Sequence, residues 1–256
     1  MKLLELDSAT AHVSVDAHAG GRLSSLVVHG LELLVAERDD PLAWGSYPMI
    51  PFAGRIRRGQ VAFRGTTAHL PLNAPPHAMH GYGFVSEWEQ TTDNELRWVF
   101  AEPWPWAGEA RQRFDLTDTG LELTMTIHAD EAQPVSAGWH PWFRRVLDDG
   151  SEVELEAAAP VMYELDDESI PNGRLIAPPP GPWDNCFTEL TRLPVLRWGN
   201  LEVRLSSTAD HWVIYNEPTH ALCVEPQTGP PNDVNFAPLV LDAGSSMDVR
   251  FTMTWG

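Results

Sequence analysis

The sequence has 256 residues, of which 43% are hydrophobic and 21% are charged. This balance is ordinary for a folded globular protein and excludes a disordered chain. Lys and Arg number 17 against 36 Asp and Glu, and the resulting formal net charge of −19 argues against a protein that binds nucleic acid or anionic membranes.

Short runs in which hydrophobic and polar residues alternate recur along the whole chain. They lie at residues 13–15, 113–116, 121–127, 201–205 and 247–255, and two further candidate strand segments are residues 88–91 and 96–99. Such alternation places one face of a β-strand on a core and leaves the other face to solvent or ligand. Turn residues at Asp93-Asn94 and Thr117–Gly120 each separate two runs, which predicts two hairpins.

The same pattern predicts the fold class. A sustained 3.6-residue hydrophobic period is absent, and strands at short spacing without helices between them favour an all-β, large antiparallel β-sandwich. Pro178–Pro182 is the strongest break in composition, and we interpret it as a stiff loop because it is short. We therefore predict one domain over residues 1–256.

The N-terminus and the cysteines bear on the cellular compartment. Met1–Thr10 has no long apolar core and does not resemble a signal peptide, and no stretch is long and apolar enough for a membrane span. Two cysteines, Cys186 and Cys223, do not make a disulfide framework, and two buried thiols are favoured over one bridge. A cytoplasmic location is the default expectation.

The first polar cluster along the chain is Pro51–Gly59. Arg55 could fork hydrogen bonds to hydroxyl groups or to a carboxylate. Strand alternation would place Arg55 and Arg57 on one face and Arg58 on the other. Three arginines within four positions are equally consistent with a solvated turn.

A second cluster, Pro75–Gly83, contains His77 and His80. The His-x-x-His spacing is compatible with metal binding, but a zinc site ordinarily needs a third protein ligand, and on a strand the two side chains would diverge. We favour a hydrogen bond from His80 to a ligand, because Gly81 permits close approach of the backbone. His77 is interpreted as loop surface.

The third cluster is Gly138–Phe143, in which His140 precedes a proline that restricts its backbone. An imidazole exchanges protons near neutral pH, so His140 is a candidate general acid. It could instead be a core histidine packed among aromatic residues.

The fourth cluster follows the proline-rich loop, where Asp184 comes after Trp183. An aromatic ring beside a carboxylate suits sugar recognition, since the ring covers an apolar sugar face and the carboxylate accepts hydroxyl protons. Asp184 could equally be a turn-forming residue.

The fifth cluster is Ala221–Thr228. On a strand, Leu222 and Val224 would face the core and Glu225 the opposite surface. Pro226 holds Glu225 in extended geometry, and a carboxylate fixed on a strand is a candidate general base. A solvated glutamate at a strand end is the structural alternative.

Taken in order, these clusters resemble the aldose 1-epimerase (galactose mutarotase) family. The matching segments are Gly54–Ile56, His80-Gly81, His140–Phe143, Trp183-Asp184 and Val224–Thr228. Here Gly54 stands where many members have Asn, Trp142 stands where Tyr is commoner, and Tyr82 follows His80-Gly81 where another glycine is usual.

The resemblance implies a galactose mutarotase-like supersandwich with a concave sugar-binding face, and a small-molecule aldose as substrate. It implies that His140 is the acid and Glu225 the base, that Arg55, His80 and Asp184 hold the sugar, and that neither a metal nor an organic cofactor is needed. Glu225 must then start ionised and His140 protonated, a state that proximity would favour. A bell-shaped pH profile follows, and a flat profile across neutral pH would count against the pair.

Three alternatives remain open at this point. A phosphosugar 1-epimerase would need cations at the pocket rim, for which Arg57 and Arg58 are the candidates. A non-catalytic carbohydrate-binding protein would require neither an acid nor a base. A metal-dependent, cupin-like isomerase or oxygenase would use His77, His80 and His140. The sequence does not predict the sugar, the pathway or the oligomeric state.

Overall fold

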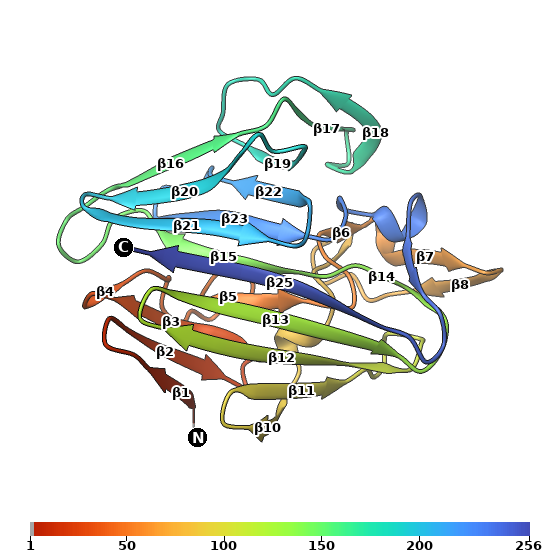
Figure 1. The fold of residues 1–256 in the computed structure, drawn as a ribbon. Coiled ribbons are helices and arrows are strands. Elements are labelled where there is room, and N and C mark those ends of the chain that lie inside the picture. The colour runs from red at the N-terminus through yellow and green to blue at the C-terminus, as the bar shows by residue number, and fades with distance from the viewer. Residues whose placement is uncertain (1–2) are drawn as a thin grey trace.

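The structure is a computed structural model that describes residues 3–256, almost entirely as β-strands joined by turns (Figure 1). Met1 and Lys2, which begin the N-terminal segment considered above, lie outside the described residues. The helical turns of residues 3–256 are short 3₁₀ turns. They are η1 (Arg57–Gly59), η2 (Gly83–Val85) and η3 (Asp233–Asn235). Within residues 3–256, no helix has the length and apolar character needed to cross a membrane.

The larger sheet of the described chain has 11 strands, in the order β1-β2-β3-β5-β15-β23-β22-β19-β17-β18, with β4 paired to β3. Its strands are β1 (Leu4–Asp7), β2 (Ala11–Asp16), β3 (Arg22–Val28), β4 (Leu31–Glu32), β5 (Ser46–Met49), β15 (Gly138–Arg144), β17 (Val161–Leu165), β18 (Pro171–Ile176), β19 (Asp184–Thr188), β22 (His211–Tyr215) and β23 (Ala221–Gln227).

The second sheet has eight strands, in the order β10-β11-β12-β13-β25-β21-β20-β16. Its strands are β10 (Glu89–Thr92), β11 (Glu95–Val99), β12 (Gly108–Thr117), β13 (Gly120–Ala129), β16 (Val153–Ala158), β20 (Arg192–Trp198), β21 (Leu201–Ser207) and β25 (Ser246–Trp255). Small two-stranded sheets pair β6 (Arg55–Ile56) with β9 (Ala78–Met79), β7 (Gln60–Phe63) with β8 (Thr66–His69), and β14 (Gln133–Val135) with β24 (Leu239–Leu241).

The two large sheets pack face to face, and Figure 1 shows β12, β13 and β25 in front of β5 and β15. The ring of Phe251 on β25 lies 6.0 Å from Trp139 on β15 and 6.3 Å from Trp212 on β22, centroid to centroid. Along β25, alternate residues from Val249 to Trp255 are buried, as the sequence pattern predicts. The predicted all-β antiparallel sandwich is confirmed, and so are both hairpins, β10–β11 and β12–β13. A single domain over residues 1–256 stays a prediction.

Strands β15 and β23 lie at the centre of the larger sheet and are buried on both faces. One face, which carries Trp139 and Val224, packs on the second sheet. The pairings Gly138↔Gln227 and Trp142↔Cys223 fix the register between the two strands. That register places the opposite faces of β15 and β23 beneath a cavity, which is described next.

Candidate active site

Five neighbouring strands of the larger sheet contribute one cross-strand row of side chains. The register of β15 with β23 puts His140 opposite Glu225, and His140 in turn pairs with Tyr47 on β5. On the other side of Glu225, the row continues through Val213 on β22 to Cys186 on β19. Because residues directly opposite in a ladder point to the same face, all five side chains lie on the face of the sheet that is turned away from the core.

A cavity of about 430 Å³ opens over this row. All five residues that the sequence predicts for the site line it: Arg55, His80, His140, Asp184 and Glu225. They come from β6, the turn after β9, β15, β19 and β23, which are separated in sequence but meet here. The volume lies within the range of about 300–1,000 Å³ found for small-molecule sites.

His140 and Glu225 form a buried pair at the inner end of the cavity. The His140 Nε2 atom lies 3.2 Å from Glu225 Oε1, and the two side chains are 6% and 2% exposed. The other carboxyl oxygen, Oε2, accepts a hydrogen bond of 3.1 Å from Gln227 Nε2. Both oxygens of Glu225 are therefore in contact with a nitrogen, and Glu225 is buried, so it is not a solvated glutamate at a strand end.

Burial acts on the pair in the direction opposite to the one expected from proximity alone. It raises the pKa of Glu225 well above its ordinary range and lowers the pKa of His140 to about 3. Desolvation thus favours neutral Glu225 with neutral His140 over the ion pair. Attraction between opposite charges 3.2 Å apart, on the order of 5 kcal/mol at an effective dielectric constant of about 20, works the other way. The two forms hold the same number of protons and differ only in which atom carries one of them.

Arg55 and Asp184 make an ion pair on the cavity wall. Arg55 Nη2 donates to Asp184 Oδ2 at 2.9 Å, and both side chains are partly exposed. Each residue therefore orients the other, while their remaining hydrogen-bonding groups face the cavity. The interpretation of Asp184 as a turn former is wrong, because Asp184 begins strand β19 opposite Tyr215.

His80 reaches the cavity through a constrained piece of backbone. Its φ of 61° is positive, and the next residue, Gly81, has a φ of 70°. The His80 ring is buried and meets the His140 ring edge-on at 5.1 Å. Burial, with lesser contributions from His140 and Arg55, lowers the pKa of His80 well below its ordinary value, so the ring is neutral near pH 7. Its Nδ1 atom is buried and has no hydrogen-bond partner within residues 3–256.

We expect Gly81→Ala to displace His80 and to destabilise the protein strongly. A Cβ atom at Gly81 would lie 2.0 Å from the Ile50 carbonyl oxygen, in addition to the strain of a positive φ. The matched control is Gly65→Ala, where φ is 83° and nothing lies within 4 Å of the added atom. Urea unfolding should show a loss of roughly 1–2 kcal/mol for the control and clearly more for Gly81→Ala. Equal losses would contradict the close approach.

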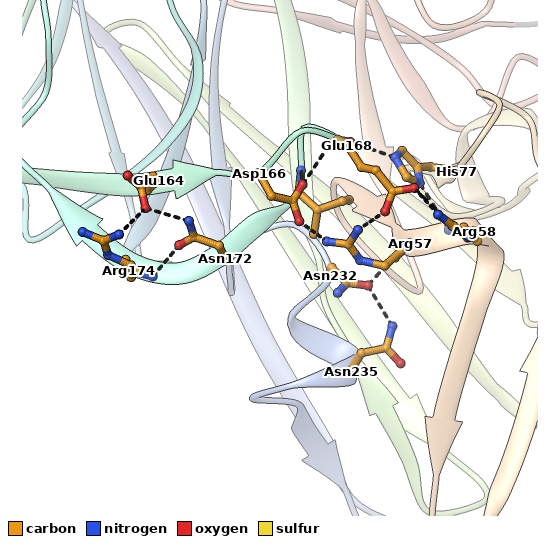
Figure 2. Close-up of polar contacts among 11 residues, drawn as sticks. Arg57, Arg58, His77, Glu164, Asp166, Glu168, Asn172, Arg174, Asn232 and Asn235 are labelled. Carbon is orange, nitrogen blue, oxygen red and sulfur yellow. Dashed lines mark hydrogen bonds and ion pairs between the residues drawn. The ribbon is translucent and has the colours of Figure 1, made fainter.

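Arg57 and Arg58 take no part in the cavity wall. Figure 2 shows both of them reaching the turn between β17 and β18, where Arg57 pairs with Asp166 and Glu168, and Arg58 Nη2 lies 2.8 Å from Glu168 Oε1. The predicted strand alternation across these arginines is wrong. Strand β6 ends at Ile56, and Arg58 has a φ of 50° in the 3₁₀ turn, so both side chains leave on the same side.

The His77 ring also makes its hydrogen bonds outside the cavity. Its Nδ1 atom accepts a hydrogen bond from the Arg58 backbone N–H, and its Nε2 atom donates to the Glu168 carbonyl (Figure 2). A metal site built from His77, His80 and His140 therefore does not form. In residues 3–256, one trio offers three metal-ligand atoms within 4.8 Å of one another: His140, Cys223 and Glu225. Both cysteines are free and buried, as predicted, and burial raises the pKa of the Cys223 thiol well above its ordinary value.

Three site features escape the sequence analysis. Gln227 contacts Glu225, although its place two residues along the same strand could have identified it. Tyr47 stacks on His140, at 4.8 Å and 24°, and no motif marks it. Arg22 is fully buried behind Tyr47, where its guanidinium donates to the carbonyls of residues 19, 41, 44 and 84.

Comparison with known proteins agrees with this architecture. The chain matches the family model described as Aldose 1-epimerase over residues 2–254. No curated protein matches it. A galactose mutarotase-like protein from Clostridium acetobutylicum superposes with a TM-score of 0.86 at 18% identity, covering 98% of this chain and 94% of that one.

Two further solved structures share the fold. An aldose epimerase homologue from C. elegans has a TM-score of 0.83 at 16% identity and covers 100% of this chain and 98% of that one. Galactose 1-epimerase from Lactobacillus acidophilus has a TM-score of 0.81 at 14% identity, with coverage of 98% and 92%. Identities this low establish the fold alone, whereas the family match spans nearly the whole sequence. The chain belongs to the aldose 1-epimerase family.

Proposed function

We propose that this protein is an aldose 1-epimerase that interconverts the α and β anomers of a free aldose, with Glu225 as the base and His140 as the acid. The observation that carries the proposal is the distance of 3.2 Å between His140 Nε2 and Glu225 Oε1 at the inner end of a sugar-sized cavity. In a pyranose, O1 and O5 are bonded to the same carbon. An acid and a base that serve these two oxygens must therefore lie side by side, as this pair does.

The reaction needs two proton transfers in each direction. Glu225 accepts the proton of the anomeric hydroxyl O1 while His140 Nε2–H protonates the ring oxygen O5. The C1–O5 bond breaks and O1 becomes the carbonyl oxygen of the free aldehyde. Rotation about C1–C2 then presents the other carbonyl face, and the reverse transfers close the ring and restore both residues. Each positioned transfer typically contributes about 10²–10⁴ in rate.

Arg55, His80 and Asp184 would hold the other hydroxyl groups of the sugar. The Arg55–Asp184 pair offers donors and an acceptor on one wall, and His80 offers a neutral imidazole next to His140. Holding the sugar while C1–C2 rotates keeps the aldehyde near the pair, so that the ring closes before the open form escapes.

The charges of the cavity favour an uncharged sugar. Among the lining residues, four acids face a single arginine, Arg55. Arg57 and Arg58, the candidates for binding a phosphate, are already paired with carboxylates (Figure 2). A phosphate group would meet net negative charge without a free cation, which counts against a phosphosugar 1-epimerase.

Polarimetry on freshly dissolved single anomers tests this function. A panel of free aldoses and their 6-phosphates should show accelerated equilibration for at least one free aldose and for none of the phosphates. Acceleration confined to a phosphate would overturn the assigned substrate class. Sugar binding without acceleration of any anomer would instead identify a non-catalytic carbohydrate-binding protein.

The pH profile should be broader than the ordinary pKa values of glutamate and histidine suggest. The reactive pair holds one shared proton, and burial, which lowers the pKa of His140 to about 3, opposes the net positive charge that a second proton would add to the pair. The raised pKa of Glu225 shifts the alkaline limb of the pH profile to higher pH. We therefore expect kcat/KM to be flat from roughly pH 5 to pH 8. This expectation replaces the bell-shaped profile predicted from the sequence, and with it the criterion that a flat profile across neutral pH would count against the pair. An inflection near pH 6.5 that vanishes in His140→Asn would contradict this protonation scheme.

A further inference from the structure

The His140–Glu225 pair can exist as two tautomers. In one, Glu225 is a carboxylic acid and His140 a neutral imidazole, and in the other, Glu225 is a carboxylate and His140 an imidazolium. The proposed reaction starts from the second form, since only that form has a free base beside a charged acid. Burial of both side chains favours the first. Local contacts that stabilise separated charge are therefore needed, and the structure contains two sets of them.

The first contact stabilises a negative charge on Glu225. Gln227 is fully buried on the same face of β23, and its amide N–H donates to Glu225 Oε2 at 3.1 Å. His140 Nε2 contacts the other oxygen, Oε1, and becomes a second donor in the charge-separated form. Hydrogen bonds donated to both oxygens favour the ionised form of a carboxyl group. The Gln227 Oε1 atom is buried without a partner, so the amide is held by its contact with Glu225 and by packing.

The second set of contacts stabilises a positive charge on His140. Its ring stacks against two aromatic rings, Tyr47 at 4.8 Å and 24° and Trp142 at 5.3 Å and 16°. Both partners come from fixed strand positions, since Tyr47 pairs with His140 across β5–β15 and Trp142 lies two residues further along β15. The face of an aromatic ring attracts a cation, most strongly when the ring is an indole and water is excluded. All three side chains are buried.

We propose that Gln227, Tyr47 and Trp142 are positioning residues that hold the pair in its charge-separated form, with Glu225 as a carboxylate and His140 as an imidazolium. The inference rests on the proposed function for its purpose, but the charge state that it assigns can be observed without any sugar. Other charged or titratable groups around the pair are His80, Arg55, Asp184, Cys223 and, behind Tyr47, Arg22.

These surrounding groups do not fix the tautomer by themselves. Arg55 and Asp184 neutralise each other in their ion pair, and His80 is neutral. The positive charge of Arg22 disfavours an imidazolium at His140, but hydrogen bonds to four carbonyl oxygens partly offset that charge. The contacts made directly on Glu225 and on the faces of His140 are therefore the ones that decide where the proton sits.

Nitrogen-15 NMR of histidine-labelled protein tests the charge state directly. In an imidazolium both ring nitrogens have similar shifts, whereas in a neutral ring the two shifts are far apart. The His140 signals are assigned as those lost in His140→Asn. At pH 7.5 and without sugar, we expect the imidazolium pattern for His140 and the neutral pattern for His80. A neutral pattern for His140 in the wild-type protein would overturn the inference.

Variants separate the two sets of contacts. Gln227→Met removes the amide donor, and Trp142→Leu removes one aromatic face, so each should move His140 toward the neutral pattern. Trp142→Phe keeps a ring and should retain the imidazolium. Gln112→Met is the matched control, because Gln112 is a buried amide that contacts Gly21 and Trp139 and not the pair. An imidazolium unchanged in both Gln227→Met and Trp142→Leu would contradict the assigned roles.

Kinetics give a second readout. Gln227→Met should lower kcat roughly ten- to a hundredfold with little change in KM, the effect of one hydrogen bond to a charged group. A purely structural role would lower the stability of the protein and leave the kcat of the folded fraction intact. If the imidazolium is seen but no aldose is turned over, the proposed function fails while the assigned charge state stands.

Discussion

Glu225→Gln is expected to lower kcat for anomer interconversion by about 10²–10⁴ while leaving KM within a few fold of the wild type. The amide has the shape of the carboxyl group and keeps a contact with Gln227, but it cannot accept the proton of O1. Arg55 and Asp184 still hold the sugar, because neither depends on Glu225 for its position. Polarimetry on single anomers, or NMR line broadening at higher enzyme concentration, measures the loss.

The pair should behave as one unit. His140→Asn removes the acid and should lower kcat by a similar factor. The double variant should be no slower than the slower single variant, because each single change already stops the coupled proton transfer. Glu202→Gln makes the same chemical change at a surface ion pair with Arg197 and should leave kcat unchanged. Full activity in both Glu225→Gln and His140→Asn would mean that the assignment of acid and base is wrong.

Arg22→Met is expected to have the largest effect on stability, a loss of about 3–5 kcal/mol in the free energy of unfolding. Arg22 is 1% exposed, and its guanidinium carries hydrogen bonds to four carbonyl oxygens and stacks 4.0 Å from Trp44. Removing it leaves buried acceptors without donors. Burial lowers the pKa of Arg22 to about 10, which still leaves it charged at neutral pH.

Function should weaken together with stability in this variant. Arg22 holds the carbonyls of Pro41 and Trp44, and this segment carries Leu42 and Ala43 into the cavity wall. Arg22→Lys should not rescue either property, because a single ammonium group cannot reach acceptors on several sides. Arg113→Met, at an exposed ion pair with Asp115, should change the free energy of unfolding by less than about 0.5 kcal/mol. Wild-type stability in Arg22→Lys would contradict this role.

The strands of the sandwich could be predicted from the sequence because, in each strand, the alternation of hydrophobic and polar residues shows which side chains are buried. Residues 121–127 alternate, and the structure buries Leu121, Leu123, Met125 and Ile127 on the core side of β13. The alternation of residues 55–58 fails for a related reason. These residues leave the strand after Ile56, and nothing in a short run of arginines indicates where a strand ends.

The residues of the candidate site could be predicted from the sequence, but the contacts between them could not. His140 and Glu225 each precede a proline and each suit proton transfer, yet their contact depends on the register of β15 and β23, which is set by pairing between distant segments. Tyr47 lies beside His140 for the same reason. The effect of burial on the pKa values of His140 and Glu225 could not be predicted either, because the depth of burial depends on how the sheets assemble and not on either segment alone.

Exchange between anomers at equilibrium gives the most direct test of the central claim, which is that one buried acid–base pair opens and closes the sugar ring in this cavity. In two-dimensional NMR exchange spectra of a 1-¹³C-labelled aldose, catalytic amounts of wild-type protein should produce cross-peaks between the α and β C1 signals. A methyl glycoside, which binds but cannot open, should suppress them, and Glu225→Gln should abolish them. Cross-peaks of equal strength with Glu225→Gln, or none with the wild type on any free aldose that it binds, would contradict the account.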